Sequence, residues 1–158
     1  MIPNRLVLDT NVCLDLFVFR DPRRAALAAA LQDGSIEAVT CADCRNEWLA
    51  VLHYACFALD ETRRAQCIAQ FDAVIRCLEI EGNPQGAVLP RCSDKDDQKF
   101  LELARDSNAS VLLTKDRALL KLAGKCRRAG FFAIADPQAW QSPVYALPVY
   151  DINSIESS

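Results

Sequence analysis

The sequence predicts a three-layer α/β/α sandwich with a central parallel sheet. Short apolar runs typical of buried strands alternate with segments of helical periodicity, which is the pattern of consecutive βαβ units. The composition is that of a packed domain, because 51% of the 158 residues are hydrophobic and 25% are charged. We therefore expect one domain over residues 1–141 and a separate tail over 142–158.

The first half of the chain contains two predicted strands, each followed by helical segments. The strands are the apolar runs at 6–8 and 36–40. Pro22 suits a first helical turn, and Gly34 is expected to end the helix that follows it. The helices of this half are predicted at 11–19, 24–31, 45–59 and 60–78.

The second half begins with a connection rich in Gly and Pro at 81–91, in which 87–89 are the candidate for a short strand. After it, the sequence predicts a helix at 94–107, a strand at 110–114, basic helical turns as far as 128, a strand at 131–135 and a short helix at 138–141. The tail from Ser142 lacks helical periodicity. We expect it to form an edge hairpin or a partner contact, with a disordered polar end.

Charge is distributed unevenly along the chain. The net charge of -3 does not favour a nucleic-acid ligand. One segment differs, because 115–128 carries six basic residues against the single acid Asp116. A local basic face that contacts nucleic acid is therefore compatible with a negative net charge of the protein.

No apolar run approaches the ~20 residues that a membrane span requires. The chain passes straight into a strand without a signal-peptide pattern, so we expect a cytoplasmic protein. Its eight cysteines are scattered through helix-like and strand-like segments, and we expect reduced, buried thiols. Cys41 and Cys44 have the spacing of half a zinc site or of a redox pair. Zinc is disfavoured because no second close pair exists and His53, expected to pack in a helix, is the only histidine.

Two predicted strands each end in a carboxylate. Asp9 closes the run at 5–9, and Asp116 follows the run at 110–114. In a parallel α/β sheet, ligands bind beyond the carboxyl ends of the strands, so both acids are expected at one edge. Two carboxylates together there suggest a bound cation.

Asp97 is a third candidate, selected by its helical phase. The residues three, four and seven positions after it are apolar, which places it at the end of a buried stripe: Phe100, Leu101 and Ala104. Asp94 and Asp96 have polar neighbours and are expected at the rim. Helix capping from Ser93 remains an alternative explanation of this acidic cluster.

Glu47 has the same helical pattern, because the residues three, four and seven positions after it are Ala50, Val51 and Tyr54. A carboxylate above an apolar helical face is costly unless it has a partner. A cap, a dipole contact or an ordinary ion pair explains each acid singly. The four together favour a shared site.

Four segments resemble, in order and spacing, the PIN domain family, and in particular the VapC-like ribonuclease toxins of bacterial toxin-antitoxin pairs. They are VLDTN at 7–11, NEWLAVL at 46–52, DKDDQKFLELA at 94–104 and LTKDRALL at 113–120. The resemblance covers about residues 6–140. It implies a PIN-like fold and an endoribonuclease that uses Mg²⁺ or Mn²⁺, with a cognate antitoxin as partner and a homodimer as assembly.

The resemblance also implies roles for individual residues. The catalytic, metal-binding acids fall on Asp9, Glu47, Asp97 and Asp116, and polar supporting positions fall on Asn11 and Thr114. We expect Asp9 with Asp97 or Asp116 to hold one ion and Glu47 to help orient the attacking water. Some family members carry a further acid after the last aspartate, where this chain has Arg117 to Lys121. The basic side chains expected to contact RNA phosphates are Lys115, Arg117 and Lys121.

Two other functions remain open from the residues. A non-catalytic PIN-like module that binds RNA or protein would use the same surface without cleavage. An aspartyl-phosphate phosphatase would place a second Asp two residues after the first, where this chain has Asn11. The chain contains no nucleophile elbow, dinucleotide fingerprint or P-loop, which disfavours those enzyme classes.

Overall fold

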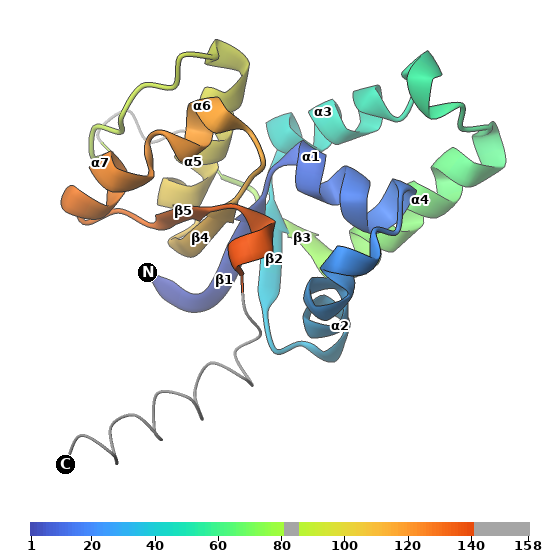
Figure 1. Cartoon of the computed structure of the whole chain (residues 1–158), viewed down its shortest axis with the longest axis horizontal. Coiled ribbons are helices and arrows are strands. Elements are labelled where there is room, and N and C mark those ends of the chain that lie inside the picture. The colour runs from blue at the N-terminus through green and yellow to red at the C-terminus, as the bar shows by residue number, and fades with distance from the viewer. Residues whose placement is uncertain (81–85, 141–158) are drawn as a thin grey trace.

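The computed structural model describes residues 1–80 and 86–140. Its centre is a sheet of five strands, all parallel, in the order β3-β2-β1-β4-β5 (Figure 1). The predicted fold class is confirmed. The predicted tail at 142–158 lies outside the described residues. The strands are β1 Ile2–Leu8, β2 Glu37–Thr40, β3 Ile75–Cys77, β4 Ala109–Leu113 and β5 Ala133–Ala135.

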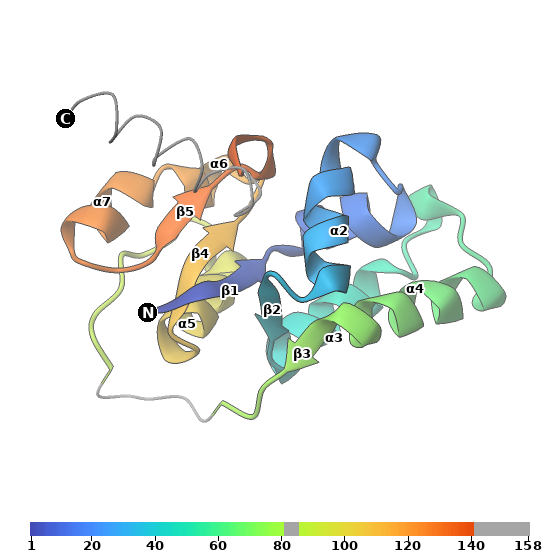
Figure 2. The same cartoon turned by 90° about the horizontal axis from the view of Figure 1, so that it is seen from below.

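Helices cover both faces of this sheet (Figures 1 and 2). On one side lie α1 Thr10–Cys13, a π-helical turn Leu14–Val18, α2 Ala25–Asp33, α3 Ala42–Val51 and α4 Glu61–Val74. On the other lie α5 Gln98–Asp106, α6 Arg117–Leu120 and α7 Ala123–Arg128. Short 3-10 turns span Pro22–Arg24, Ala55–Phe57, Lys95–Asp97 and Pro137–Ala139.

The strands are apolar on both faces because each face supports its own core. In β1, Leu6 and Leu8 pack into the core under α1 to α4, whereas Val7 packs into the core under α5 to α7. In β4, Leu113 packs into the core under α1 to α4, and Leu112 packs into the core under α5 to α7. This two-sided burial explains why the strands appear in the sequence as continuous apolar runs rather than as alternating patterns.

The helix predicted over 60–78 is wrong at its end. α4 stops at Val74, and Ile75 opens β3 by pairing with Ala38 of β2. Ile75 and Leu78 keep the helical phase of Phe71, so periodicity alone extends the helix across the boundary. The β-branched Ile75 instead fills the edge of the sheet, where it is buried.

Other boundaries also differ from the sequence predictions. The helix expected over 45–59 begins at Ala42 and ends at Val51, and Ala58 later adopts a positive φ of 50°. Residues 87–89 form no strand in the described part of the chain. Gly34 ends α2 as predicted, with the left-handed φ of 79° that a glycine tolerates.

All eight cysteines lie within the described residues and are free thiols. Five are buried as expected and Cys41 is half-buried, but Cys56 and Cys77 are exposed, and so is His53 just after α3. The expectation for these three was wrong because they lie beyond the ends of buried helical stripes. Among the described residues, no helix combines the length and the apolar character needed to cross a bilayer.

Candidate metal centre

The acids at the strand ends meet at the point where the strand order of the sheet reverses. β1 and β4 are neighbours, with Leu8 opposite Leu113. The helix after β1 lies on one face of the sheet, and the helix after β4 lies on the other. The backbone N–H of Asp9 donates to the carbonyl of Leu113 at 2.9 Å. Asp9 follows β1 directly, and Asp116 lies just after β4, so both carboxylates lie at the usual ligand position of an open parallel sheet.

Asp97 joins them from a third segment, the 3-10 turn that leads into α5. One carboxylate oxygen from each of Asp9, Asp97 and Asp116 lies within 4.8 Å of the other two. The phase argument for Asp97 is confirmed, because it is buried together with Phe100 and Leu101. Asp94 and Asp96 are exposed, as expected. Asp94, rather than Ser93, caps the turn by accepting from the backbone N–H of Asp96 at 3.0 Å.

Asp9 is the most constrained of the three acids. Its side chain accepts hydrogen bonds from the Thr10 backbone N–H at 2.6 Å, the Thr114 hydroxyl at 2.7 Å and the Asn11 amide at 3.2 Å. Asn11 and Thr114 are the two predicted supporting positions, and both contact the same Oδ2 atom. Thr114 Oγ1 also accepts from the backbone N–H of Asp116 at 3.0 Å, so one hydroxyl links the two strand-end acids.

Burial raises the pKa of Asp9 from its usual 3.8 to about 6. The hydrogen bonds from Thr114 and Thr10 oppose this shift, while the negative charges of Glu47 and Asp116 add to it. The metal-free protein therefore holds this carboxylate in an environment that disfavours its charge. A cation bound beside it would reverse that preference.

Asp97 and Asp116 share a hydrogen bond, and their pKa values move apart. Burial and the hydrogen bond to Asp116 raise the pKa of Asp97, whereas that bond and the Ala118 N–H lower the pKa of Asp116. Of the two carboxyl groups, Asp97 therefore holds its proton more tightly. Its Oδ2 atom is buried and has no hydrogen-bond partner among the described residues. A buried, unpartnered carboxylate oxygen at a cluster of acids fits a ligand of a cation.

Glu47 lies beside the three-acid group rather than within it. Its Oε2 accepts from the Thr10 hydroxyl, and its Oε1 pairs with Lys99 Nζ at 2.9 Å. The phase argument for Glu47 was wrong. The buried stripe of α3 runs through Cys44, Trp48 and Val51, while Glu47 is half-buried and Ala50 and Tyr54 are exposed. Glu47 reaches the site from the side of its helix.

Lys99 and Thr10 are contacts that the sequence reasoning missed. Thr10 had a local signal, because it directly follows Asp9 at the start of a helix. Lys99 had none, since it pairs with Glu47 across a separation of 52 residues. Together they use both oxygens of Glu47 and orient its carboxylate at the edge of the site.

The predicted RNA contact Lys115 is anchored by a buried acid. Lys115 Nζ lies 3.0 Å from both carboxylate oxygens of Asp15, and its backbone N–H donates to Asn11 at 3.2 Å. Asp15 also pairs with Arg24 at 3.3 Å, and these two side chains are each only 4% exposed. Arg24 donates to Gln138 at 3.3 Å. The sequence reasoning missed Asp15, which is a single acid within an apolar run.

The other two predicted RNA contacts are on the surface. Arg117 and Lys121 lie on and just after α6, and both are exposed. Asp116 caps this helix by accepting from the Ala118 N–H at 2.9 Å. The two basic side chains are therefore fixed to the same turn as one of the clustered acids.

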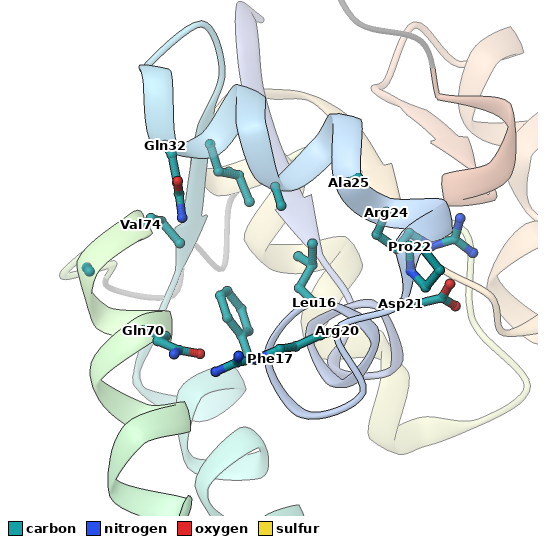
Figure 3. Close-up of a pocket in the computed structure, with 13 residues that line it drawn as sticks. Leu16, Phe17, Arg20, Asp21, Pro22, Arg24, Ala25, Gln32, Gln70 and Val74 are labelled. Carbon is teal, nitrogen blue, oxygen red and sulfur yellow. The ribbon is translucent and has the colours of Figure 1, made fainter.

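A pocket of about 470 Å³ lies apart from the acids (Figure 3). It is bounded by α2, α4 and the π-helical turn, and its lining includes Phe17, Arg20, Gln32 and Gln70. None of the predicted site residues lines it. The acid cluster, rather than this pocket, is the site that the strand topology favours.

A family model described as PIN domain matches residues 5–118, which is well over half of the chain. The match includes all four predicted acids and both supporting positions. No curated protein matches the chain.

Proposed function

The chain belongs to the PIN domain family, and we propose that it is a divalent-metal-dependent endoribonuclease that hydrolyses RNA phosphodiester bonds. The observation that carries this proposal is the convergence of Asp9, Asp97 and Asp116 within 4.8 Å at the reversal point of the sheet. Charged groups gathered at such a position are typical of a functional site.

The donor set fits a hard divalent cation. Mg²⁺ and Mn²⁺ prefer carboxylate oxygens, and the three aspartates supply them, including the unpartnered Oδ2 of Asp97. Either ion satisfies this chemistry. We propose one ion held by these three acids, because the positions after Asp116 carry Arg117 and Lys121 instead of a further acid.

When bound, the ion supplies positive charge for the phosphodiester and makes an attacking water molecule more acidic. Residues of the chain orient the carboxylates that would hold the ion. Thr114, Asn11 and Thr10 fix the carboxylate of Asp9, and the start of α6 fixes Asp116. Asp97 gives up its proton to act as a ligand, so binding is expected to weaken as the pH falls.

We propose that Glu47 orients the attacking water. The Thr10 hydroxyl and Lys99 hold its carboxylate from two directions, so it faces the edge of the three-acid cluster. Hydrogen bonds that fix a functional carboxylate typically improve its orientation and tune its basicity.

We propose that the cations beside Asp116 bind the RNA substrate. Arg117 and Lys121 are exposed and would contact RNA phosphates, and Lys115 would contribute from a side chain that remains 36% exposed. Arg117 and Lys121 thus place exposed positive charge beside the acid cluster, where it favours the approach of a polyanion.

We further propose that the protein is a VapC-like toxin. A cognate antitoxin would bind it and cover the acid cluster, and the toxin would act as a homodimer. Its substrate and its free thiols suit the cytoplasm. The support for this subtype is the four-segment resemblance in the sequence.

The test is cleavage of a single-stranded RNA with Mn²⁺ present. We expect wild type to cleave it, chelation to stop cleavage, and Asp9→Asn and Asp116→Asn to reduce the rate by about a hundredfold or more. Asp96→Asn is the matched control, because Asp96 belongs to the same acidic segment as Asp97 but is exposed. Unchanged cleavage in Asp9→Asn would contradict the role of Asp9. RNA binding by wild type without any cleavage would favour a binding module.

A further inference from the structure

The Cys41-Ala42-Asp43-Cys44 motif is not used by the proposed nuclease site. Cys41 directly follows β2 and is the N-cap residue of α3, and Cys44 lies in the first turn of this ten-residue helix. Figure 1 shows α3 starting beyond the carboxyl end of β2. Two cysteines in this strand–CxxC–helix arrangement are typical of redox-active thiols.

The two thiols lie on one helical turn. Cys41 is the N-cap residue of α3 and Cys44 is the third residue of the helix, so their side chains start from neighbouring positions of its first turn. Formation of a bond between the two sulfurs is therefore a local change at the start of α3.

The two sulfurs differ in accessibility. Cys41 is half-buried and can be reached from solvent, whereas Cys44 is 4% exposed and its Sγ lies 4.0 Å from the Lys99 carbonyl. This difference assigns the roles in an exchange reaction. Cys41 is the thiol that an external disulfide can reach, and Cys44 is the thiol that completes the internal bond.

The start of α3 favours the thiolate of Cys41. The interaction with the Cys44 thiol lowers the pKa of Cys41 to about 6, and the backbone N–H groups of Cys44 and Asp43 contribute. The same interaction, followed by burial, raises the pKa of Cys44.

The remaining six cysteines, all within the described residues, offer internal controls. Cys56 and Cys77 are exposed but lie far from any other cysteine in the sequence. A zinc site would need four ligands, and the pair supplies two. Among the described residues, the one group of three or more potential metal ligands is the aspartate cluster.

We propose that Cys41 and Cys44 form a reversible dithiol–disulfide pair that exchanges with small-molecule disulfides such as glutathione disulfide. The Cys41 thiolate attacks one sulfur of glutathione disulfide, forms a mixed disulfide and releases one glutathione thiolate. Cys44 then loses its proton to solvent and attacks the Cys41 sulfur, which releases the second glutathione. The two cysteines lose two electrons and the external disulfide gains them. Excess dithiol reverses both steps.

The experiment uses the full chain with Cys56→Ser and Cys77→Ser, which removes the exposed thiols that could cross-link molecules. The reduced protein is treated with glutathione disulfide, its free thiols are alkylated, and its peptides are analysed by mass spectrometry. We expect the peptide that contains residues 41–44 to lack two hydrogens and to resist alkylation until dithiothreitol is added. Adding Cys44→Ser should trap glutathione on Cys41. A peptide with both thiols alkylated, or with stable glutathione on Cys41 while Cys44 is present, would overturn the proposal.

A second measurement needs no substitution and does not depend on nuclease activity. In wild-type protein, the rate of alkylation of Cys41 should reach half its maximum at a pH at least one unit below that of free glutathione under the same conditions. Equal midpoints for Cys41 and glutathione would also overturn the proposal.

Discussion

At the scale of single residues, burial and hydrogen bonds act in opposite directions on the charge of Asp9. Asp9 is only 4% exposed, yet three donors contact it, and its pKa still rises to about 6. Burial therefore outweighs the hydrogen bonds. Such a carboxylate lowers the stability of the metal-free protein at neutral pH, which is the usual condition of a site built to hold a charged ligand.

The first prediction concerns the stability of Asp9→Asn as a function of pH. Because Asp9 binds its proton more tightly when folded, the free energy of unfolding falls as the pH rises from about 4 to about 6, and it stays lower above that range. The loss is up to ~3 kcal/mol for a two-unit shift. Without metal, Asp9→Asn should therefore be more stable than wild type at pH 8, and this gain should disappear near pH 4. Urea denaturation at both pH values measures it. An identical difference at both would contradict the raised pKa, and Asp96→Asn should show no such gain.

The second prediction concerns Thr114, whose hydroxyl donates to Asp9 and accepts from the Asp116 N–H. Thr114→Val keeps the shape but leaves both groups without this partner, so it should destabilise the protein at pH 8 by about 1–3 kcal/mol. It should also raise the pKa of Asp9 further. Thr114→Ser keeps the hydroxyl and is the matched control. Equal unfolding free energies for the two variants would show that the hydroxyl contributes nothing.

At the scale of elements, Lys115 joins the helical segment after β1 to the segment after β4. Its backbone contacts Asn11, and its ammonium contacts Asp15 in the π-helical turn. Asp15 in turn balances the buried Arg24, which reaches Gln138 of the last 3-10 turn. These contacts hold the segment that carries Asp116 against the segment that carries Asp9.

The third prediction uses the unequal burial of this ion network. Asp15→Ala leaves Arg24 as a buried, unpaired charge and should cost about 3–5 kcal/mol of unfolding free energy. Lys115→Met removes the more exposed partner and should cost ~1 kcal/mol or less. Chemical denaturation compares the two variants. Equal costs would contradict the view that Asp15 serves mainly to neutralise Arg24. Arg23→Ala breaks the exposed pair with Asp21 and is the control.

The sequence alone predicts those elements and site residues that leave a local pattern. Asp9 and Asp116 are found because each follows an apolar strand, and Asp97 because its helical phase is buried. Ile75 is misassigned because its pairing with Ala38 involves a distant segment. The Lys115–Asp15 pair likewise joins residues 100 positions apart, so no periodicity within one helix or strand reveals it.

At the scale of the whole molecule, the strand order explains why three distant acids meet. The helices that follow β1 and β2 cover one face of the sheet, whereas those that precede and follow β4 cover the other, so the strand order reverses between β1 and β4 and their carboxyl ends lie side by side. α5 packs against β1 and β4, and the turn before it brings Asp97 into that space. The topology thus creates the position, and the three carboxylates give it an affinity for cations.

The central claim is that Asp9, Asp97 and Asp116 form one divalent metal site, and calorimetric titration of the metal-free protein with Mn²⁺ tests it most directly. We predict one ion bound per chain, loss of that binding in Asp97→Asn and in Asp116→Asn, and unchanged binding in Asp96→Asn. Absence of Mn²⁺ binding by folded wild type, or binding that survives both cluster substitutions, would contradict the claim.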